Sequence, residues 1–486
     1  MTVQHSGWSL TIDQGGHASR AIVFDEQGRL IAQAEYAIAT LTPRLDWVEH
    51  DAAAVVDSVY HAITDLLQQL GRDSHRIRAA GLATQRASIV CWDRNSGRPL
   101  SPVLSWQDCR NRQWLTRFTH KQAWIHKKTG LKLSPHYGAS KIRWCLDHLS
   151  PVQQALEEGC LAIGPLASYL LFRLLEQRPL LADPANASRT QLWHLGQQRW
   201  DKMLLTLYDI PEAILPHCCH SRHHFGDLDI SGRKIPLILT TGDQSAALFA
   251  WGEPQPETAY INLGTGAFVQ RITPTPLHSD KLLTSVVYSS KQRRCYTLEG
   301  TLNGAARALQ WFAQREGIDN LEQRLPEWME EIENPPLFLN GVAGLAAPDW
   351  VADFESRFIG KGTLPARAVA VAESIVFLLQ RIMVESEHHL SAAKQLQISG
   401  GLASLSPLCQ RLADLTGRPI YRPNTLEATA RGLAYLITRQ PEHWPITKEK
   451  STLFTPQTAP GLTERYCRWK AKLEQALSEE KGGVGK

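Results

Sequence analysis

Two aspartates in this sequence stand where strand-like runs end, and each lies close to a glycine-rich turn. Asp243 follows the apolar run 237–241 and Gly242, and the small residues after it are suited to starting a helix. A carboxylate between a strand end and a helix start lies where α/β folds place their chemistry. A base so close to the glycine-rich loop 262–266, which is of a size to hold a phosphate, suggests phosphoryl transfer. The alternative is that Asp243 is only a helix N-cap.

Two short turns have the composition that a phosphate group needs. The turn 14–19 joins the strand-like runs 8–13 and 20–25, and Gly264-Thr265-Gly266 joins two similar runs. Glycine and small residues leave backbone N–H groups open to an anion. The repeated layout predicts two similar domains whose hairpins face each other across a cleft and hold the phosphates of a nucleotide. Taken singly, each turn also fits an ordinary hairpin.

A third glycine turn follows the predicted strand 395–399. Gly400-Gly401 comes next, and Ser406-Pro407 then begins a helix, with Ser406 expected as the N-cap. A strand, two glycines and a helix start predict a seat for adenosine or its phosphates. A simple β–α turn is the alternative.

The elements between these turns mix strands and helices. Apolar residues at helical spacing predict a helix over 55–70, short strands surround it, and the segment 114–215 is expected to be mainly helical. This mixture favours an α/β architecture over a pure dinucleotide-binding repeat. There is no GxxxxGK[ST] motif, no GxGxxG after a strand and no GxSxG motif. The pair His223-His224 lacks a carboxylate or cysteine at ligand spacing, so a metal site there is not expected.

Length and composition limit the function classes further. The 486 residues suggest at least two domains, and 43% hydrophobic with 21% charged residues is ordinary for a soluble globular protein. The net charge is only +4, without a Lys/Arg block, so we expect no nucleic-acid partner. Nine cysteines without a CxxC pair, no signal peptide and no apolar run of about 20 residues predict a cytoplasmic protein without a membrane partner.

Eleven stretches, in order, resemble the FGGY carbohydrate kinases, most closely the glycerol kinases, across nearly the whole chain. They are DQGGHASRAIVFDEQGRLI from Asp13, WVEHD from Trp47, TQRASIVCWDRNSGRPL from Thr84, SWQDCR from Ser105, YGASKIRWCLDH from Tyr137, DPANASRT from Asp183, GDQSAALFAWG from Gly242, LGTGAF from Leu263, LEGTLNGAARALQW from Leu298, SGGLASLSPLCQRLADLTGRPI from Ser399 and EATARGLAYL from Glu427. Each stretch alone is a weak signal, whereas the ordered set is a strong one.

The resemblance implies two actin-like ATPase (ribonuclease-H-like) domains with a central cleft, over residues 1–252 and 253–486. It implies ATP- and Mg²⁺-dependent phosphorylation of a polyol or sugar hydroxyl, with Asp243 as the general base and with Asp13 and Asp243 near the metal. The implied substrate-binding residues are Arg86, Ala87, Trp106, His136, Asp243 and Gln244. The implied ATP- and phosphate-binding residues are Asp13, Gly15, Gly16, His17, Ala18, Ser19, Arg20, Gly264, Thr265, Gly266, Gly400, Gly401 and Ser404, with the segment 427–432 also at the adenosine site.

The sequence departs from the glycerol kinases at the substrate and at the first phosphate turn. Ala87 stands where they carry a glutamate that binds a glycerol hydroxyl, His136 replaces a tyrosine, and Gly16-His17 replaces threonines. Loss of a charged acceptor should cost about 1.5–3 kcal/mol of binding. We therefore expect a bulkier polyol or ketose than glycerol. Trp106 is either an apolar wall for the substrate's carbons or a core residue.

The expected partners are therefore a small polyol or sugar and ATP, and homodimer formation stays open. The alternative function is a non-catalytic sugar- or nucleotide-sensing pseudokinase on the same fold, motivated by Gly16-His17 and Ala87. Retention of Asp13 and Asp243 argues for catalysis. Because ATP would contact both halves, we expect closure of the two domains on binding.

Overall fold

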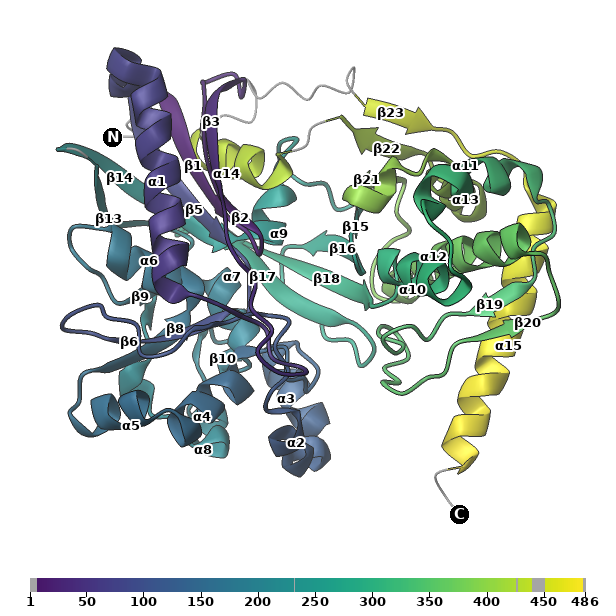
Figure 1. The fold of residues 1–486 in the computed structure, drawn as a ribbon, viewed down its shortest axis with the longest axis horizontal. Helices are drawn as coiled ribbons and strands as arrows, with labels where there is room; N and C mark the ends of the chain where they lie inside the picture. Colours follow the sequence, from purple (N-terminus) through teal and green to yellow (C-terminus); the bar gives the residue numbers. More distant parts are fainter. Residues whose placement is uncertain (1–6, 231, 425–426, 439–450, 484–486) are drawn as a thin grey trace.

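The computed structural model describes residues 7–230, 232–424, 427–438 and 451–483. It has two lobes, each built on a mixed β-sheet (Figure 1). The first sheet has the order β13-β14-β5-β1-β2-β3. Its strands are β1 (Trp8–Gln14), β2 (Ala18–Phe24), β3 (Leu30–Ala37), β5 (Ile77–Thr84), β13 (Arg222–Ile230) and β14 (Arg233–Gly242).

The second sheet repeats the connections of the first. Its order is β17-β18-β16-β15-β21-β22-β23. Its strands are β15 (Thr258–Leu263), β16 (Ala267–Thr273), β17 (Leu283–Ser289), β18 (Arg294–Leu302), β21 (Gln395–Ser399), β22 (Ile420–Pro423) and β23 (Ser451–Phe454). In each sheet an antiparallel hairpin comes first, and two later strands then add in parallel beside its first strand. This duplication confirms the predicted two-lobed α/β fold.

Apolar helical faces cover the two sheets. The helix α1 (Ala52–Leu70) begins at Asp51, whose side chain accepts a hydrogen bond from the Ala54 amide, and buries a stripe of valine, isoleucine and leucine. In the second lobe, α12 (Leu364–Glu387) is buried along most of its length. The other second-lobe elements are α10 (Ala306–Glu316), α11 (Leu321–Glu331), β19 (Leu337–Leu339), β20 (Arg357–Ile359), α13 (Ser406–Thr416) and α15 (Pro460–Gly483).

The segment 114–215 is less purely helical than its sequence predicts. A four-stranded sheet, order β4-β7-β6-β8, supports it, and β8 passes through this segment. The strands are β4 (Glu49–His50), β6 (Ile89–Asp93), β7 (Val103–Leu104) and β8 (Leu161–Pro165), with the short pairs β9 (Leu181–Ala182), β12 (His217–Cys218), β10 (Trp193–His194) and β11 (Arg199–Trp200). The helices are α2 (Arg112–Leu115), α3 (Gln122–Thr129), α4 (Gly138–His148), α5 (Ser150–Glu157), α6 (Leu166–Leu174), α7 (Pro184–Ala187) and α8 (Lys202–Tyr208).

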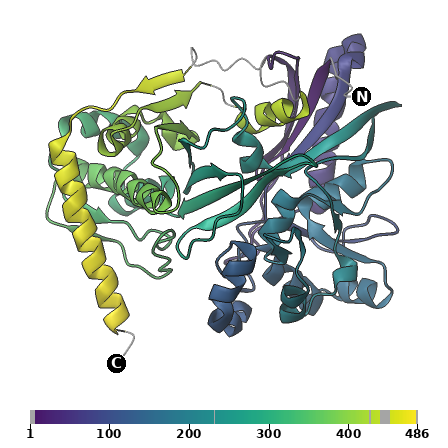
Figure 2. The same ribbon diagram turned by 180° about the vertical axis from the view of Figure 1, so that it is seen from behind.

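One helix from the C-terminal half crosses to the first lobe. The helix α14 (Ala428–Thr438) packs on β1, β5 and the short helix α9 (Asp243–Ala247). Its buried leucines and alanines share a core with Ile22, Ala79 and Leu239. Figures 1 and 2 show α14 beside the first sheet, and β15 and β16 on the side of the second lobe that faces it. The junction between the lobes is therefore formed by segments distant in the sequence.

Candidate active site

Three parallel strands of the first sheet end at the same level, and each delivers a candidate residue. Asp13 on β1 pairs with Ala83 on β5, which pairs with Thr241 on β14. Arg86 therefore follows the end of β5 between two acids, Asp13 and Asp243. The predicted strand 237–241 lies within β14, which also includes Gly242, predicted as a turn. The helix α9 begins at Asp243, two residues earlier than predicted, and Gly242 is its N-cap, so Asp243 is not a helix N-cap.

Asp13 is buried, Asp243 is partly buried, and the charge of Asp243 acts on Asp13. Asp13 is only 8% exposed. Burial, followed by the charge of Asp243, raises the pKa of Asp13 to about 7. Burial also raises the pKa of Asp243, although Arg86 opposes this rise. Two neighbouring carboxylates that are largely removed from water are costly without a cation, so this donor set fits a divalent metal such as Mg²⁺.

Arg86 lies directly against the residue that precedes Asp243. Its side-chain stem covers Gly242, where a Cβ atom would come within 2.3 Å of the Arg86 Cδ. One Nη group donates a hydrogen bond to Gln244 Oε1. The other, Nη1, is buried and has no hydrogen-bond partner within the described residues. Arg86 therefore has an unused donor at the same sheet edge as Asp243, suited to a substrate hydroxyl.

The other predicted substrate residues come from nearby loops. Ala87 is buried and has a left-handed backbone, with φ at 65°. Trp106 is 41% exposed, so it is not a core tryptophan, and its amide donates to Ser88. His136 Nδ1 donates to the Trp106 carbonyl at 3.2 Å. The histidine and the tryptophan are thus fixed to each other beside the loop that carries Arg86.

The first of the predicted phosphate turns is shorter than expected. Only Gly15, Gly16 and His17 lie outside the strands, closed by a 2.9 Å bond from the Gly15 amide to the Ala18 carbonyl. Ala18, Ser19 and Arg20 belong to β2 instead. The prediction that Ala18 and Ser19 belong to the turn is wrong, because β2 already begins at Ala18, whereas Arg20 lies in the second strand as predicted. Gln14, also expected in the turn, is the last residue of β1.

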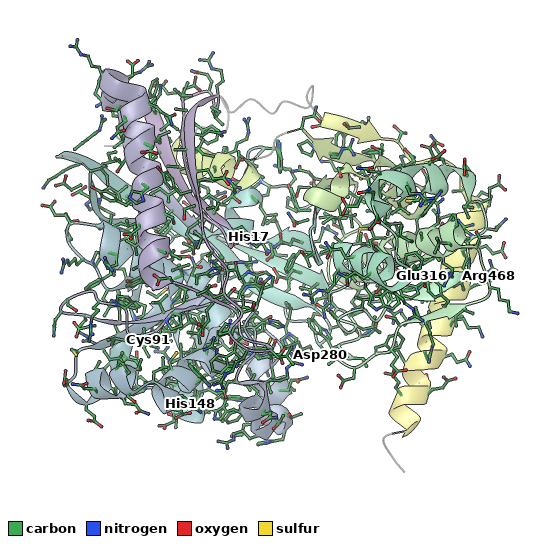
Figure 3. All side chains as sticks on the ribbon, viewed as in Figure 1. His17, Cys91, His148, Asp280, Glu316 and Arg468 are labelled. Carbon is green, nitrogen blue, oxygen red and sulfur yellow. The ribbon has the colours of Figure 1, made fainter. Side chains whose placement is uncertain are left out.

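The side chains at the start of β2 have partners away from the turn. The Ser19 hydroxyl is buried against Ser58 of α1, and Arg20 donates to Glu35 on β3 at 2.9 Å. His17 at the tip is exposed, and Figure 3 labels it on the side of the first lobe that faces the second. His17 is therefore the exposed residue of this turn, and Gly15 and Gly16 are partly buried.

The second turn is anchored to the start of α10. The Ala306 and Arg307 amides donate to the carbonyls of Gly264 and Thr265, at 3.2 and 3.1 Å. The charge of Arg307 also lowers the pKa of His136, after the larger effects of ring desolvation and Lys141. The charge of a residue anchored to the second-lobe turn therefore acts on His136, a predicted substrate residue of the first lobe.

The third turn has one constrained and one open glycine. Gly400 has φ at 94°, and a Cβ there would come within 2.4 Å of the Leu263 carbonyl, whereas Gly401 has open space beside it. Ser404 is exposed and donates to the Gly401 carbonyl at 2.8 Å. Ser406 is the first residue of α13 and not its N-cap. Gly400 thus joins this turn closely to the end of β15.

A buried ion pair between the lobes was not identified in the sequence. Arg189, just after α7, pairs with Glu299 on β18, and Gln270 also donates to Glu299 at 3.2 Å. Burial would raise the pKa of Glu299, but Arg189 and Arg86 together lower it. Both residues lie in stretches that carry the family resemblance, DPANASRT and LEGTLN. Neither stretch indicates from its own sequence that Arg189 forms an ion pair with Glu299.

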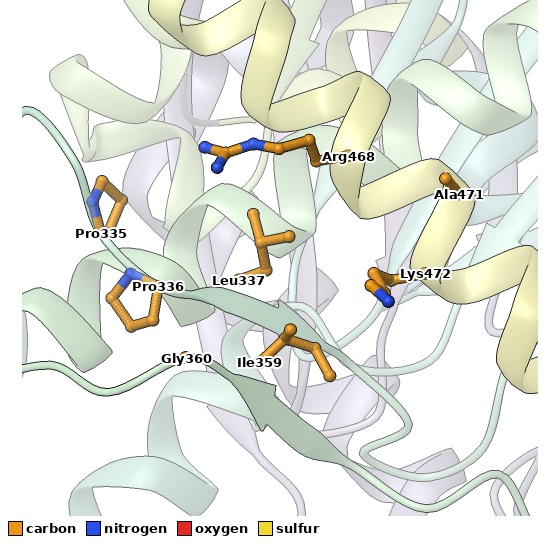
Figure 4. A pocket seen from close by; sticks show the side chains of 8 residues that line it. All are labelled: Pro335, Pro336, Leu337, Ile359, Gly360, Arg468, Ala471 and Lys472. Atoms are coloured by element: carbon orange, nitrogen blue, oxygen red, sulfur yellow. The ribbon is translucent and has the colours of Figure 1, made fainter.

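A separate pocket lies on the outer side of the second lobe. Its lining residues come from the segments around β19 and β20 and from α15 (Figure 4), and none is a predicted site residue: Pro335, Pro336, Leu337, Ile359, Gly360, Arg468, Ala471 and Lys472. Within the described ranges, no three histidine, cysteine or acidic residues lie close enough together to hold a metal ion. His223 and His224 therefore have no third ligand beside them in this part of the chain. No described helix is long and apolar enough to span a membrane.

Comparison with known proteins agrees with this geometry. Residues 8–250 match the N-terminal domain of the FGGY family of carbohydrate kinases, and residues 259–440 match the C-terminal domain. The chain belongs to the FGGY family of carbohydrate kinases.

Relatives within this kinase family extend over nearly the whole chain. A glycerol kinase of Allorhizobium ampelinum is 32% identical over 455 residues, which cover 90% of this chain and 91% of the relative. The fold is shared with the Plasmodium falciparum glycerol kinase crystallised with ADP, at TM-score 0.88 and 23% identity, covering 97% and 98% of the two chains. It is shared also with the xylulose kinase of Rhodospirillum rubrum, at TM-score 0.85 and 17% identity, covering 99% and 100%. The FGGY kinase fold and the kinase class are thus as the sequence predicts.

Proposed function

We propose that this carbohydrate kinase transfers the terminal phosphoryl group of ATP to a hydroxyl of a small polyol or sugar other than glycerol. The observation that carries the proposal is the common sheet edge at which Asp13, Arg86 and Asp243 meet. A base and an unused guanidinium donor can there orient one hydroxyl beside a buried acid. The division into domains 1–252 and 253–486, the cytoplasmic location and the homodimer remain predictions.

In this mechanism Asp243 accepts the proton of the reacting hydroxyl. Burial raises the pKa of Asp243, which makes the carboxylate a stronger base than an exposed aspartate. Arg86 holds the substrate through its free Nη1 group, and Gln244 keeps the guanidinium in place. The backbone N–H groups near Gly16, Thr265 and Gly401 bind the ATP phosphates.

Asp13 and Asp243 are the residues that would hold Mg²⁺. When bound, this ion would neutralise charge on the phosphate oxygens. The two carboxylates would in turn be relieved of their mutual repulsion. The fit of the donor set thus supports a metal-dependent kinase.

The carbon substrate is expected to be larger than glycerol. Ala87 provides a small, apolar surface where the glycerol kinases carry a glutamate, and exposed Trp106 provides an apolar face beside it. The two similar solved structures named above act, by name, on glycerol and on xylulose. Xylulose and its five-carbon analogues are therefore the first substrates to test.

A phosphorylation screen over three- to seven-carbon polyols and ketoses tests the proposal. We expect ATP-dependent formation of a sugar or polyol phosphate with at least one substrate of four or more carbons, and a lower kcat/KM for glycerol. ATP binding without turnover on any of them would contradict the proposal and favour the non-catalytic sensor.

A further inference from the structure

Lys141 is a buried cation in an unfavourable position. It lies in the first turn of α4 and is 1% exposed. Burial costs a charged ammonium its hydration, and the positive end of the helix dipole repels a cation there. Fold stability alone therefore does not explain a lysine at this position.

Both hydrogen bonds of the Lys141 ammonium go to backbone carbonyls. Lys141 Nζ donates to the carbonyl of Ala87 at 3.0 Å and to the carbonyl of His136 at 2.8 Å. No carboxylate within the described residues lies within ion-pair distance of it. Asp108, the acid with the largest influence on its charge, is already paired with Arg110 at 2.7 Å.

These two carbonyls belong to the two substrate-side positions at which the chain departs from the glycerol kinases. Ala87 directly follows Arg86, and His136 is fixed to Trp106. A left-handed backbone costs energy in a residue with a Cβ atom, so Ala87 keeps φ at 65° only if its surroundings hold it. The buried Lys141 side chain binds the Ala87 carbonyl, which helps to hold this backbone conformation, and it binds the His136 carbonyl as well.

We propose that Lys141 is a positioning residue. By binding the carbonyls of Ala87 and His136, it fixes these two residues relative to each other and so sets the shape of the site for the carbon substrate. The inference rests on the proposed function, because it assigns both residues to the substrate side. Lys141 itself contacts no predicted ATP-binding residue in the structure. Its loss should therefore affect the carbon substrate and not ATP.

Burial lowers the pKa of Lys141 to about 7. Near neutral pH the side chain is thus partly a neutral amine. A neutral amine still has two N–H groups, which are enough for the two carbonyls. The proposed positioning role therefore requires the two N–H donors of Lys141 and does not require its positive charge.

The experiment compares Lys141→Met, which removes both donors, with Lys141→Gln and Lys141→Arg, which keep at least two. In Lys141→Met we expect KM for the best carbon substrate to rise at least tenfold, while KM for ATP stays within twofold. Lys141→Gln or Lys141→Arg should recover part of the lost affinity. A merely structural lysine would instead change the melting temperature and both KM values together.

Lys128→Met is the matched control. Lys128 also lies in the first lobe and is largely buried, but its Nζ pairs with Asp201 at 2.7 Å, away from Ala87 and His136. We expect this variant to lower the melting temperature and to leave both KM values unchanged.

Three results would overturn the proposal. In Lys141→Met, the carbon-substrate KM stays as in the wild type, or both KM values change in parallel. If that variant does not fold, the same comparison is made on Lys141→Leu, which also removes both donors, and a wild-type carbon-substrate KM in that variant would count against the proposal. Absence of turnover by the wild type on every substrate is distinguishable from these results and would contradict the proposed function as well.

Discussion

The two sheets share one order of strands but differ in what stands at the strand ends. In the first sheet β1, β5 and β14 lead to Asp13, Arg86 and Asp243. In the second, β15 and β21, which correspond to β1 and β5, lead to Gly264 and Gly400. The same scaffold therefore carries charged side chains in one lobe and bare backbone in the other. We therefore expect the first lobe to supply the reacting groups and the second lobe to bind most of the nucleotide.

The predicted phosphate turns of the two lobes are also held in place by different contacts. The first turn is tied to the chain beyond β3, where the Ile38 amide donates to the His17 carbonyl at 2.7 Å. The second is tied to a helix start through Ala306 and Arg307. Substitutions in the two lobes should accordingly affect different steps, and the four predictions below test this division.

The largest expected effect is on the first lobe. Asp243→Asn removes the base but keeps the size of the side chain, so kcat should fall by about 10²–10⁴-fold. Binding of metal-free ATP, measured by calorimetry without Mg²⁺ and without the carbon substrate, should change little. A variant with near wild-type kcat would show that another group accepts the proton.

The second prediction concerns the contact between the lobes. Glu299→Gln leaves the buried Arg189 without its anion and should lower the free energy of unfolding by about 3–5 kcal/mol, measured by urea denaturation. Glu316→Gln is the control, because Glu316 pairs with Arg367 within the second lobe and is partly exposed. This pair should be worth about 1 kcal/mol or less. If both variants lose the same free energy of unfolding, the ion pair between the lobes stabilises the protein no more than the pair within the second lobe.

The strand ends themselves could be predicted from the sequence. The run 237–241 before Asp243 and the hairpin layout of both turns give strong local signals, namely apolar runs broken by glycine. These signals are short-range, because they depend on each residue's own backbone preferences. The order of the motifs then gave the family and hence the two-lobed fold.

The interlobe pairing could not be predicted in the same way. Arg189 and Glu299 lie 110 residues apart, and the residues around each form an ordinary short helix and an ordinary strand. Lys141 sits in a helical pattern that gives no sign of its two carbonyl partners. Such contacts depend on how the lobes and loops pack, which a local pattern does not contain. Ser19 shows the opposite error, because membership in a glycine-rich stretch did not make it part of the turn.

The third prediction tests the second lobe. Gly400→Ala adds a Cβ close to the Leu263 carbonyl at a positive φ, so it should lower the free energy of unfolding by about 1–3 kcal/mol and raise KM for ATP. Gly401→Ala, the neighbouring control, meets no atom of the protein and should leave thermal stability unchanged. If the stability of Gly400→Ala equals that of the wild type, β15 and the turn are not in close contact.

The fourth prediction returns to the first lobe and to its departure from the glycerol kinases. Ala87→Glu restores an anionic acceptor beside Arg86 without changing the second lobe. If that acceptor is worth about 1.5–3 kcal/mol, kcat/KM for glycerol should rise roughly 10- to 150-fold, while KM for ATP stays the same. Ala87→Gln introduces a side chain of the same size as glutamate but without charge, so it should give a smaller rise in kcat/KM for glycerol. A parallel change in KM for ATP would show that the two lobes do not divide substrate and nucleotide as their strand ends suggest. An unchanged glycerol preference would show instead that His136 and the loop around it, and not the missing carboxylate, exclude glycerol.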